Sequence, residues 1–167
     1  ILSSLYLNNI QKICVVNAAG PAHKKNLSIS DYHLGIVDFT KRLANDALNL
    51  NANLLNISSI SARKIIDVKD LKDDHYAIAK FSAENYLKTT LKNKKVNSIS
   101  LRPPAIWGED APGTFKLIDK VLKSKIPLPI KSIMTKRAYI HINSICEYIA
   151  KTVKALENVS LSEHCIF

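Results

Sequence analysis

The chain has 167 residues, and 47% of them are hydrophobic, which is enough for about one globular domain with a sizeable core. No apolar run approaches the roughly 20 residues that a membrane-spanning helix needs, so we expect no membrane partner. The formal net charge of +10 comes mainly from lysines scattered over polar helix faces, and aromatic residues are not interleaved with them. We therefore expect solvated surface charge and no nucleic-acid partner.

The three cysteines, Cys14, Cys146 and Cys165, lie far apart in the sequence. No pair of them has the spacing of a metal site or of a redox motif. We therefore expect reduced, mostly buried thiols, no metal site, and a cytoplasmic protein without an export signal.

Apolar strands alternate with amphipathic helices in the first two thirds of the chain. The short apolar runs 12–19 and 53–58 are typical of buried parallel strands. Helical spacing of apolar residues predicts a helix of about four turns over 34–50 and another from about 74 to 91. A third strand follows from about 95 and is halted at Pro103 and Pro104, since proline cannot donate to a central ladder.

The last third of the chain predicts further elements of both kinds. We expect a helix over about 113–125, a short strand over 137–142, a helix over 143–157 and the start of a strand at 163–167. The alternation predicts an α/β fold with a doubly wound parallel sheet.

Ligands of such sheets bind beyond the carboxyl ends of the strands, so the residues there are candidates for a site. Ala18 and Ala19 follow the first strand, and such small residues let a cofactor lie against the backbone. Ser58 and Ser59 follow the second strand, where their hydroxyls could hydrogen-bond a carbonyl or an alcohol. We expect these residues to converge on one pocket with the helix that carries Tyr76.

Tyr76 and Lys80 are four residues apart and so share one face of their helix. A lysine ammonium near the phenol should pull its pKa below about 10, toward the range of a general base. Ser59 could then hold the substrate oxygen whose proton Tyr76 removes, in a hydride transfer that needs a nicotinamide. The same spacing also occurs by accident in helices without any catalytic role.

Five segments in order resemble the extended short-chain dehydrogenase/reductase family, and in particular its NAD-dependent nucleotide-sugar epimerases and dehydratases. The segments are VVNAAGPAH, NISSIS, YAIAK, SLRPPAIWGEDAPGTF and KRAYIHINSICEYIAKTV. The resemblance implies a Rossmann-like sheet. It also implies that Tyr76 is the general acid/base, that Lys80 is its electrostatic partner and binds the nicotinamide ribose, and that Ser59 orients the substrate.

The resemblance also implies two sets of binding residues. Those for the cofactor, NAD rather than NADP, are Ala18, Ala19, Ser58, Tyr76, Lys80 and Pro103. Those for a nucleotide-sugar substrate are Ser59, Thr114 and Arg137, of which Arg137 would grip the diphosphate.

The glycine-rich turn with which this family holds the cofactor pyrophosphate has no counterpart here, because none of the four glycines has its spacing. We therefore expect an N-terminally truncated portion of a longer enzyme, inactive by itself. The resemblance implies that the complete enzyme is a homodimer. Residues 1–102 would be a partial dinucleotide-binding portion. Residues 103–167 would be a partial substrate-binding portion, with 137–167 partly returning to the main sheet.

The function that the resemblance implies best is a 4-epimerase of surface-polysaccharide synthesis, which oxidises and re-reduces the sugar at its 4-hydroxyl. Alternatives in the same family are a dehydratase, whose acidic residues would stand where Ile60 and Ser61 are found, and a 4-ketoreductase. Two further alternatives are a non-catalytic relative that binds RNA or protein, and a degenerate fragment with an unpaired apolar sheet edge.

Overall fold

A computed structural model describes residues 12–21, 27–67, 74–109, 120, 123–124, 138–158 and 165–166. Its elements in chain order are β1 (Cys14–Asn17), α1 (Ile29–Tyr32), the π-helical η2 (His33–Asp38), α2 (Phe39–Asn49), β2 (Asn53–Ile57), α3 (Ser61–Asp67), α4 (His75–Thr90), β3 (Ser98–Leu101), β4 (Ala105–Trp107), β5 (Tyr139–His141), α6 (Ile142–Leu156) and β6 (Cys165–Ile166).

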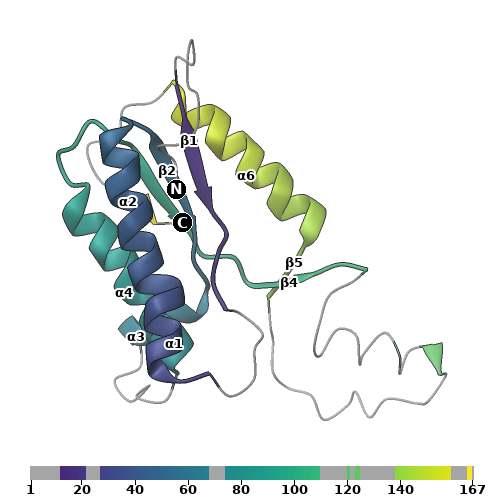
Figure 1. Cartoon of the computed structure of the whole chain (residues 1–167). Coiled ribbons are helices and arrows are strands. Elements are labelled where there is room, and N and C mark those ends of the chain that lie inside the picture. Colours follow the sequence, from purple (N-terminus) through teal and green to yellow (C-terminus); the bar gives the residue numbers. More distant parts are fainter. Residues whose placement is uncertain are drawn as a thin grey trace.

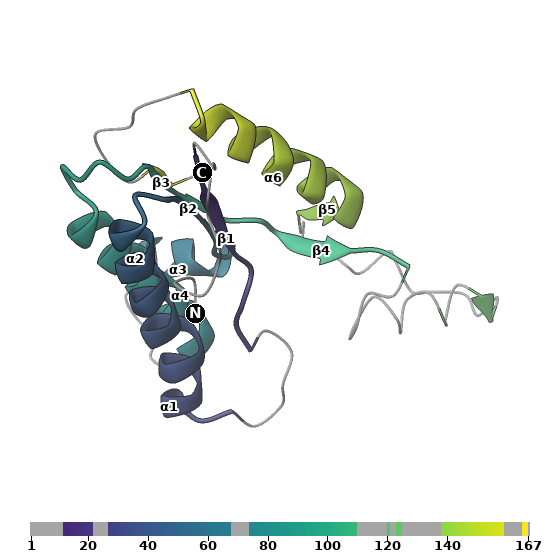
Figure 2. The same ribbon diagram turned by 45° about the horizontal axis from the view of Figure 1, so that its top comes forward.

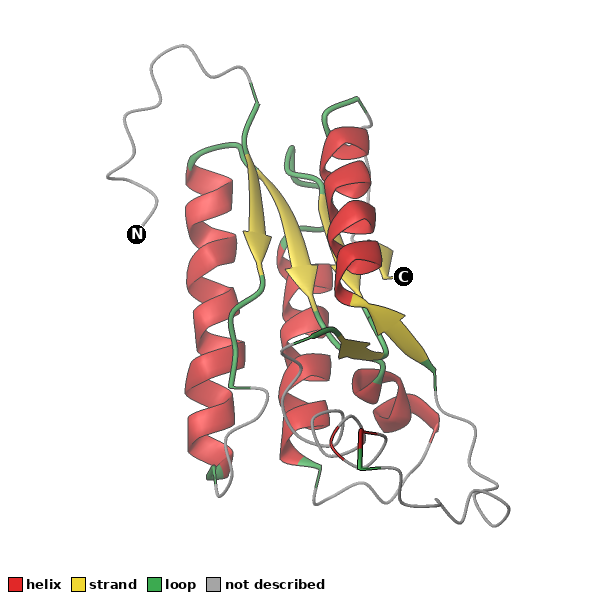
Figure 3. Ribbon diagram, turned by 90° about the vertical axis from the view of Figure 1, so that its right-hand side faces the viewer, coloured by secondary structure: helices red, strands yellow, loops and turns green. Residues whose placement is uncertain are grey.

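The main sheet has four parallel strands in the order β1-β2-β3-β6. Helices cover both of its faces: α2 and α4 stand on one side and α6 on the other (Figure 1, Figure 3). A second, two-stranded parallel sheet, β4-β5, lies against α6 beyond the ends of β1 to β3 (Figure 2). The predicted α/β fold with a doubly wound parallel sheet is confirmed, whereas the division into portions at residue 102 stays a prediction.

Each face of the main sheet has its own core cluster because neighbouring residues of a strand point to opposite faces. Leu54 packs with the residues of α2 and α4, including Ala44 and Leu87. Leu55, its neighbour in β2, packs on the other face with β3 residues and with Leu156 of α6. Both leucines are completely buried, which explains why β2 reads as a continuous apolar run in the sequence.

A row of polar side chains crosses the buried sheet at one register position. Asn17, Asn56 and Ser100 are partners across β1, β2 and β3. The amide of Asn17 donates to Oδ1 of Asn56 at 3.0 Å and to Oγ1 of Thr40 at 3.2 Å. The amide of Asn56 donates to Oγ of Ser100 at 3.1 Å. These hydrogen bonds tie the three strands and α2 together just before the strands end.

The predicted helices and strands that fall on described residues are present, with shifted ends. The helix predicted over 34–50 begins earlier, at Ile29, where Ser28 and Asp31 form a capping box, and it passes through η2 before α2. The helix predicted over about 113–125 lies largely outside the described residues. Nowhere in the described ranges is a helix long and apolar enough to cross a membrane.

Two details differ from what the sequence predicts. Helix α3 and strand β4 have no counterpart among the predicted elements. The expectation of mostly buried thiols is wrong for Cys146, which is exposed on α6, while Cys14 is half-buried in β1. The amphipathic pattern of α6 leaves the position of Cys146 on its solvent side.

Candidate active site

Lys80 lies at the carboxyl ends of β1 and β2. Its side chain leaves α4 on the face that it shares with Tyr76, and the residue is only 6% exposed. The Nζ atom donates a hydrogen bond of 2.8 Å to the carbonyl oxygen of Ile57, the last residue of β2. The turn after β1 also lies close to the Nζ atom of Lys80. A Cβ atom added at Gly20 in this turn would be 3.7 Å from Nζ. The lysine is therefore held where the sheet topology places a ligand.

Tyr76 lies one turn before Lys80, with the lysine Nζ 5.9 Å from the centre of its ring. The ring of Tyr32 packs edge-on against it, with 6.0 Å between the ring centres. The side chain of Ser59 lies close enough to the Tyr76 phenol to lower its pKa. The structure thus brings together the three residues for which the sequence predicts a catalytic role.

The expected lowering of the Tyr76 pKa is wrong for this chain. Burial of the phenol raises its pKa above 10.0, and the nearby side chain of Ser59 only partly offsets this. Lys80 is itself too deeply buried to act as a full positive charge at every pH, since burial lowers its pKa to about 8. At neutral pH the phenol of Tyr76 is therefore protonated, which is the form that donates a proton.

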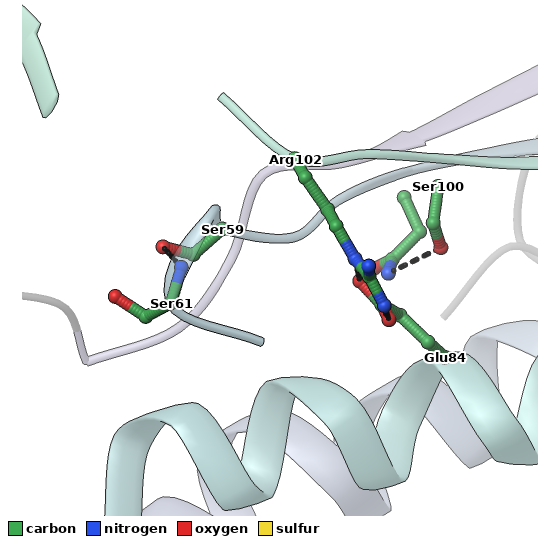
Figure 4. Close-up of polar contacts among 6 residues, drawn as sticks. Ser59, Ser61, Glu84, Ser100 and Arg102 are labelled. Atoms are coloured by element: carbon green, nitrogen blue, oxygen red, sulfur yellow. Dashed lines mark hydrogen bonds and ion pairs between the residues drawn. The ribbon is translucent and has the colours of Figure 1, made fainter. Parts of the chain in front are cut away.

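Ser58 and Ser59 lie in the turn between β2 and α3, and they differ in their surroundings. Oγ of Ser59 accepts a hydrogen bond of 3.2 Å from the backbone N–H of Ser61, next to it in Figure 4. Ser58 is 4% exposed, and its Oγ has no hydrogen-bond partner among the described residues. A buried hydroxyl without a partner costs about 1–3 kcal/mol. A polar atom of a ligand would remove this cost.

The other predicted binding residues are placed in part. Ala18 and Ala19 are exposed just after β1, and the N–H of Ala19 donates to Oδ1 of Asn17 at 3.2 Å. Pro103 is buried after β3, and its carbonyl oxygen accepts from the N–H of Ile60 at 3.0 Å. Thr114 and Arg137 lie outside the described residues. The cofactor candidates therefore surround the ends of the three strands β1, β2 and β3.

Two residues near the site, Tyr32 and Glu84, were not predicted from the sequence as site residues. Tyr32 contacts Tyr76, and Glu84 forms an ion pair with Arg102 one turn beyond Lys80. A signal for Glu84 was present in its spacing, since it is four residues after Lys80 on the same helix face. Nothing in the spacing signals Tyr32, which reaches the site only because α1 packs beside α4.

The burial of Lys80 makes the stability of the fold depend on pH. Its pKa falls from 10.5 to about 8, mainly because burial disfavours the ammonium, while Glu84 opposes the fall. Between these values the unfolded chain binds more protons than the folded chain, so the free energy of unfolding rises with pH. We expect a rise of about 1.5 kcal/mol from Lys80 between about pH 8 and about pH 9.5.

Urea unfolding over this pH range measures the effect, with Lys80→Met as the matched control. The raised pKa values of Cys14 and Tyr76 lower stability at higher pH, but they act in both proteins. The difference between the two pH profiles therefore isolates Lys80. Parallel profiles would show that Lys80 is not buried as described.

Comparisons with known proteins find the same arrangement of elements in solved structures. No model of a known protein family matches the chain. A curated UDP-glucose 4-epimerase of Vibrio cholerae is 27% identical over 82 residues, which are 48% of this chain and 25% of that protein.

Solved structures match nearly the whole chain. A UDP-galactose 4-epimerase has a TM-score of 0.71 at 15% identity, covering 97% of this chain and 57% of its own. A UDP-N-acetylglucosamine 4-epimerase from Methanobrevibacter ruminantium M1 has a TM-score of 0.66 at 20% identity, with 99% and 58% covered. A dTDP-glucose 4,6-dehydratase from Streptomyces venezuelae, solved with NAD, has a TM-score of 0.69 at 16% identity, with 92% and 51% covered.

The fold expected from the five sequence segments is confirmed by these neighbours, which are named as two 4-epimerases and a 4,6-dehydratase. The chain spans between half and three fifths of the length of these structures. The likeness therefore shows the fold of this chain.

Proposed function

We propose that this chain is the substrate-activating portion of an NAD-dependent nucleotide-sugar 4-epimerase. The observation that carries the proposal is the group of Tyr76, Ser59 and Lys80 at the carboxyl ends of the parallel strands. Neighbours of the same fold act on nucleotide sugars according to their names, among them 4-epimerases. A phenol, a hydroxyl and an ammonium close together suit proton transfer to and from a sugar hydroxyl.

Ser59, Tyr76 and Lys80 would divide the chemistry of such a site between them. Ser59 would hold the 4-hydroxyl of the sugar, since its side chain lies beside the phenol. Tyr76 would take the hydroxyl proton when C4 is oxidised and give it back when C4 is reduced. Lys80, donating to Ile57 beside the phenol, would favour the ionised form of Tyr76 whenever the lysine is protonated.

The described residues fit the nicotinamide end of NAD. When bound, NAD would supply the hydride acceptor and a positive charge near the phenol. The unpartnered hydroxyl of Ser58 offers a buried hydrogen-bonding group there. Gly20 has a φ of +143°, and a side chain at this position would come 3.3 Å from Cγ1 of Ile36, so the backbone approaches closely beside Lys80. Small and exposed residues, Ala18 and Ala19, precede it.

The pyrophosphate end of NAD has no holder in this chain, because its four glycines do not form a glycine-rich turn. We expect that the 167-residue chain alone gives no NAD binding in calorimetry. The longest protein that contains this chain in frame should bind NAD. Binding to the isolated chain at micromolar concentration would show that other residues hold the pyrophosphate.

Product analysis of the same longer protein tests the activity. We expect the protein to convert UDP-glucose to UDP-galactose. Chromatography that separates the two nucleotide sugars measures the conversion. Loss of water to a 4-keto-6-deoxy product from a dTDP-sugar would establish a dehydratase instead. The opposite outcome is that the protein turns over no UDP- or dTDP-sugar with NAD and binds RNA with a salt-dependent affinity. These two results would contradict the enzymatic function and support an RNA-binding function.

A further inference from the structure

A buried ion pair joins α4 to the end of β3. The Glu84 side chain is 0% exposed and that of Arg102 is 12% exposed. Nη2 of Arg102 lies 2.5 Å from Oε2 of Glu84, and Nε lies 2.9 Å from Oε1 and 3.2 Å from Oε2. Figure 4 shows the guanidinium of Arg102 reaching from the end of its strand to Glu84 on the helix below. Both carboxylate oxygens therefore have a donor on Arg102.

The pair is the second of two ties between one face of α4 and the strand ends. Lys80 donates to the carbonyl of Ile57 in β2, and Glu84, one turn later, holds Arg102 just after β3. Ile57 and Leu101, the last residues of these two strands, are register partners. Lys80 and Glu84 therefore bind the ends of two neighbouring strands at adjacent register positions.

Lys80 and Glu84 would pair with each other if Arg102 were absent. They are oppositely charged, four residues apart, and buried on the same helix face. A carboxylate without solvent needs a cationic donor, and the ammonium of Lys80, which already feels the charge of Glu84, is an alternative to Arg102. Such a pair would draw the ammonium away from Ile57 and from Tyr76.

We propose that Glu84 and Arg102 are positioning residues for Lys80: by occupying the carboxylate, Arg102 leaves the lysine ammonium at the carbonyl of Ile57. The inference rests on the proposed function only for the role of Lys80 in the site. The placement of the ammonium itself is a property of this chain without NAD or sugar.

The charged and titratable groups that face Lys80 are few among the described residues. Helix α4 contributes Tyr76 and Glu84, and the segment after β3 contributes Arg102 behind Glu84. The ends of β1 and β2 contribute backbone, at Gly20 and Ile57. The negative charge of Glu84 opposes the fall of the Lys80 pKa. The pKa of Lys80 therefore reports how much of this charge is neutralised by Arg102.

The experiment is an NMR titration of the side-chain Cε and Nζ resonances in the chain labelled with ¹³C- and ¹⁵N-lysine. Lys80→Arg assigns the signal. Glu84→Gln removes the attraction and should lower the Lys80 pKa by about one unit, whereas Arg102→Met frees the carboxylate and should raise it by about one unit. Asp38→Asn, which removes the exposed partner of Lys41, is the matched control and should leave the Lys80 pKa unchanged.

Opposite shifts in the two variants support the inference. A merely structural pair would loosen the site in both variants and move the Lys80 pKa toward the exposed value of about 10.4 in each. That result, or an unchanged pKa in Glu84→Gln, would overturn it. If Arg102→Met does not fold, Arg102→Lys takes its place, because it keeps a cation but loses the fork that reaches both carboxylate oxygens. The titration uses neither NAD nor substrate. It can therefore support the positioning of Lys80 even if the protein has no epimerase activity, and it can contradict the positioning even if the protein is an epimerase.

Discussion

Replacing Tyr76 by phenylalanine in the longest protein that contains this chain should lower epimerase turnover by about 1,000-fold, a typical effect of losing a general acid/base. The substitution removes only the phenol oxygen, which lies beside the side chain of Ser59. The ring that packs edge-on against Tyr32 and lies near the Nζ of Lys80 is kept. We therefore expect kcat to fall while KM and NAD affinity change little.

Tyr86→Phe is the matched control for this prediction. It lies on the same helix, but its ring packs with a different core cluster, away from the strand ends. Steady-state kinetics with the nucleotide sugar should therefore give nearly unchanged kcat for Tyr86→Phe. Turnover of Tyr76→Phe within a few fold of the unmodified protein would refute the role of Tyr76 as acid/base.

The positions of the catalytic candidates follow from local sequence, but their protonation does not. The spacing of Tyr76 and Lys80 fixes that they share a helix face, and the polar end of β2 places Ser59 nearby. The direction of the Tyr76 pKa depends instead on how much of the phenol is buried and on Tyr32. Those contacts come from the packing of separate helices, which no short sequence pattern encodes.

The same distinction separates the predicted elements from the missed ones. Strand β2 and helix α4 carry a continuous apolar or helical pattern, so periodicity alone predicts them. Strand β4 has three residues, all exposed, and exists because it pairs with β5 about thirty residues later. Helix α3 has seven residues, too short to show a convincing period. Short elements of this kind are set by their tertiary partners.

The ion pair of Glu84 and Arg102 shows that the sequence does not predict the environment of a single side chain. Each side chain reads in the sequence as an ordinary charge, one within a helix and one after a strand. Only the packing of α4 against the end of β3 buries the carboxylate completely and gives it a partner. The chemical environment of Lys80 therefore depends on a contact between residues 18 positions apart.

Asn56→Ala should lower the free energy of unfolding of the chain by about 3 kcal/mol, because it breaks two buried hydrogen bonds and leaves a small cavity. The acceptor of the Asn17 amide and the donor to Ser100 are lost together. Asn85→Ala, on the exposed side of α4, is the control and should cost less than about 0.5 kcal/mol. Urea unfolding measures both variants.

A double-mutant cycle with Ser100→Ala locates the effect in the polar row itself. Because Asn56 and Ser100 share a hydrogen bond of 3.1 Å, their combined cost should be smaller than the sum of the single costs by about 1 kcal/mol. Additive costs, or a loss below about 1 kcal/mol in Asn56→Ala, would mean that the row does not hold the strands in register. The strand ends that carry Ile57 and Ser58 would then owe their alignment to the helix contacts alone.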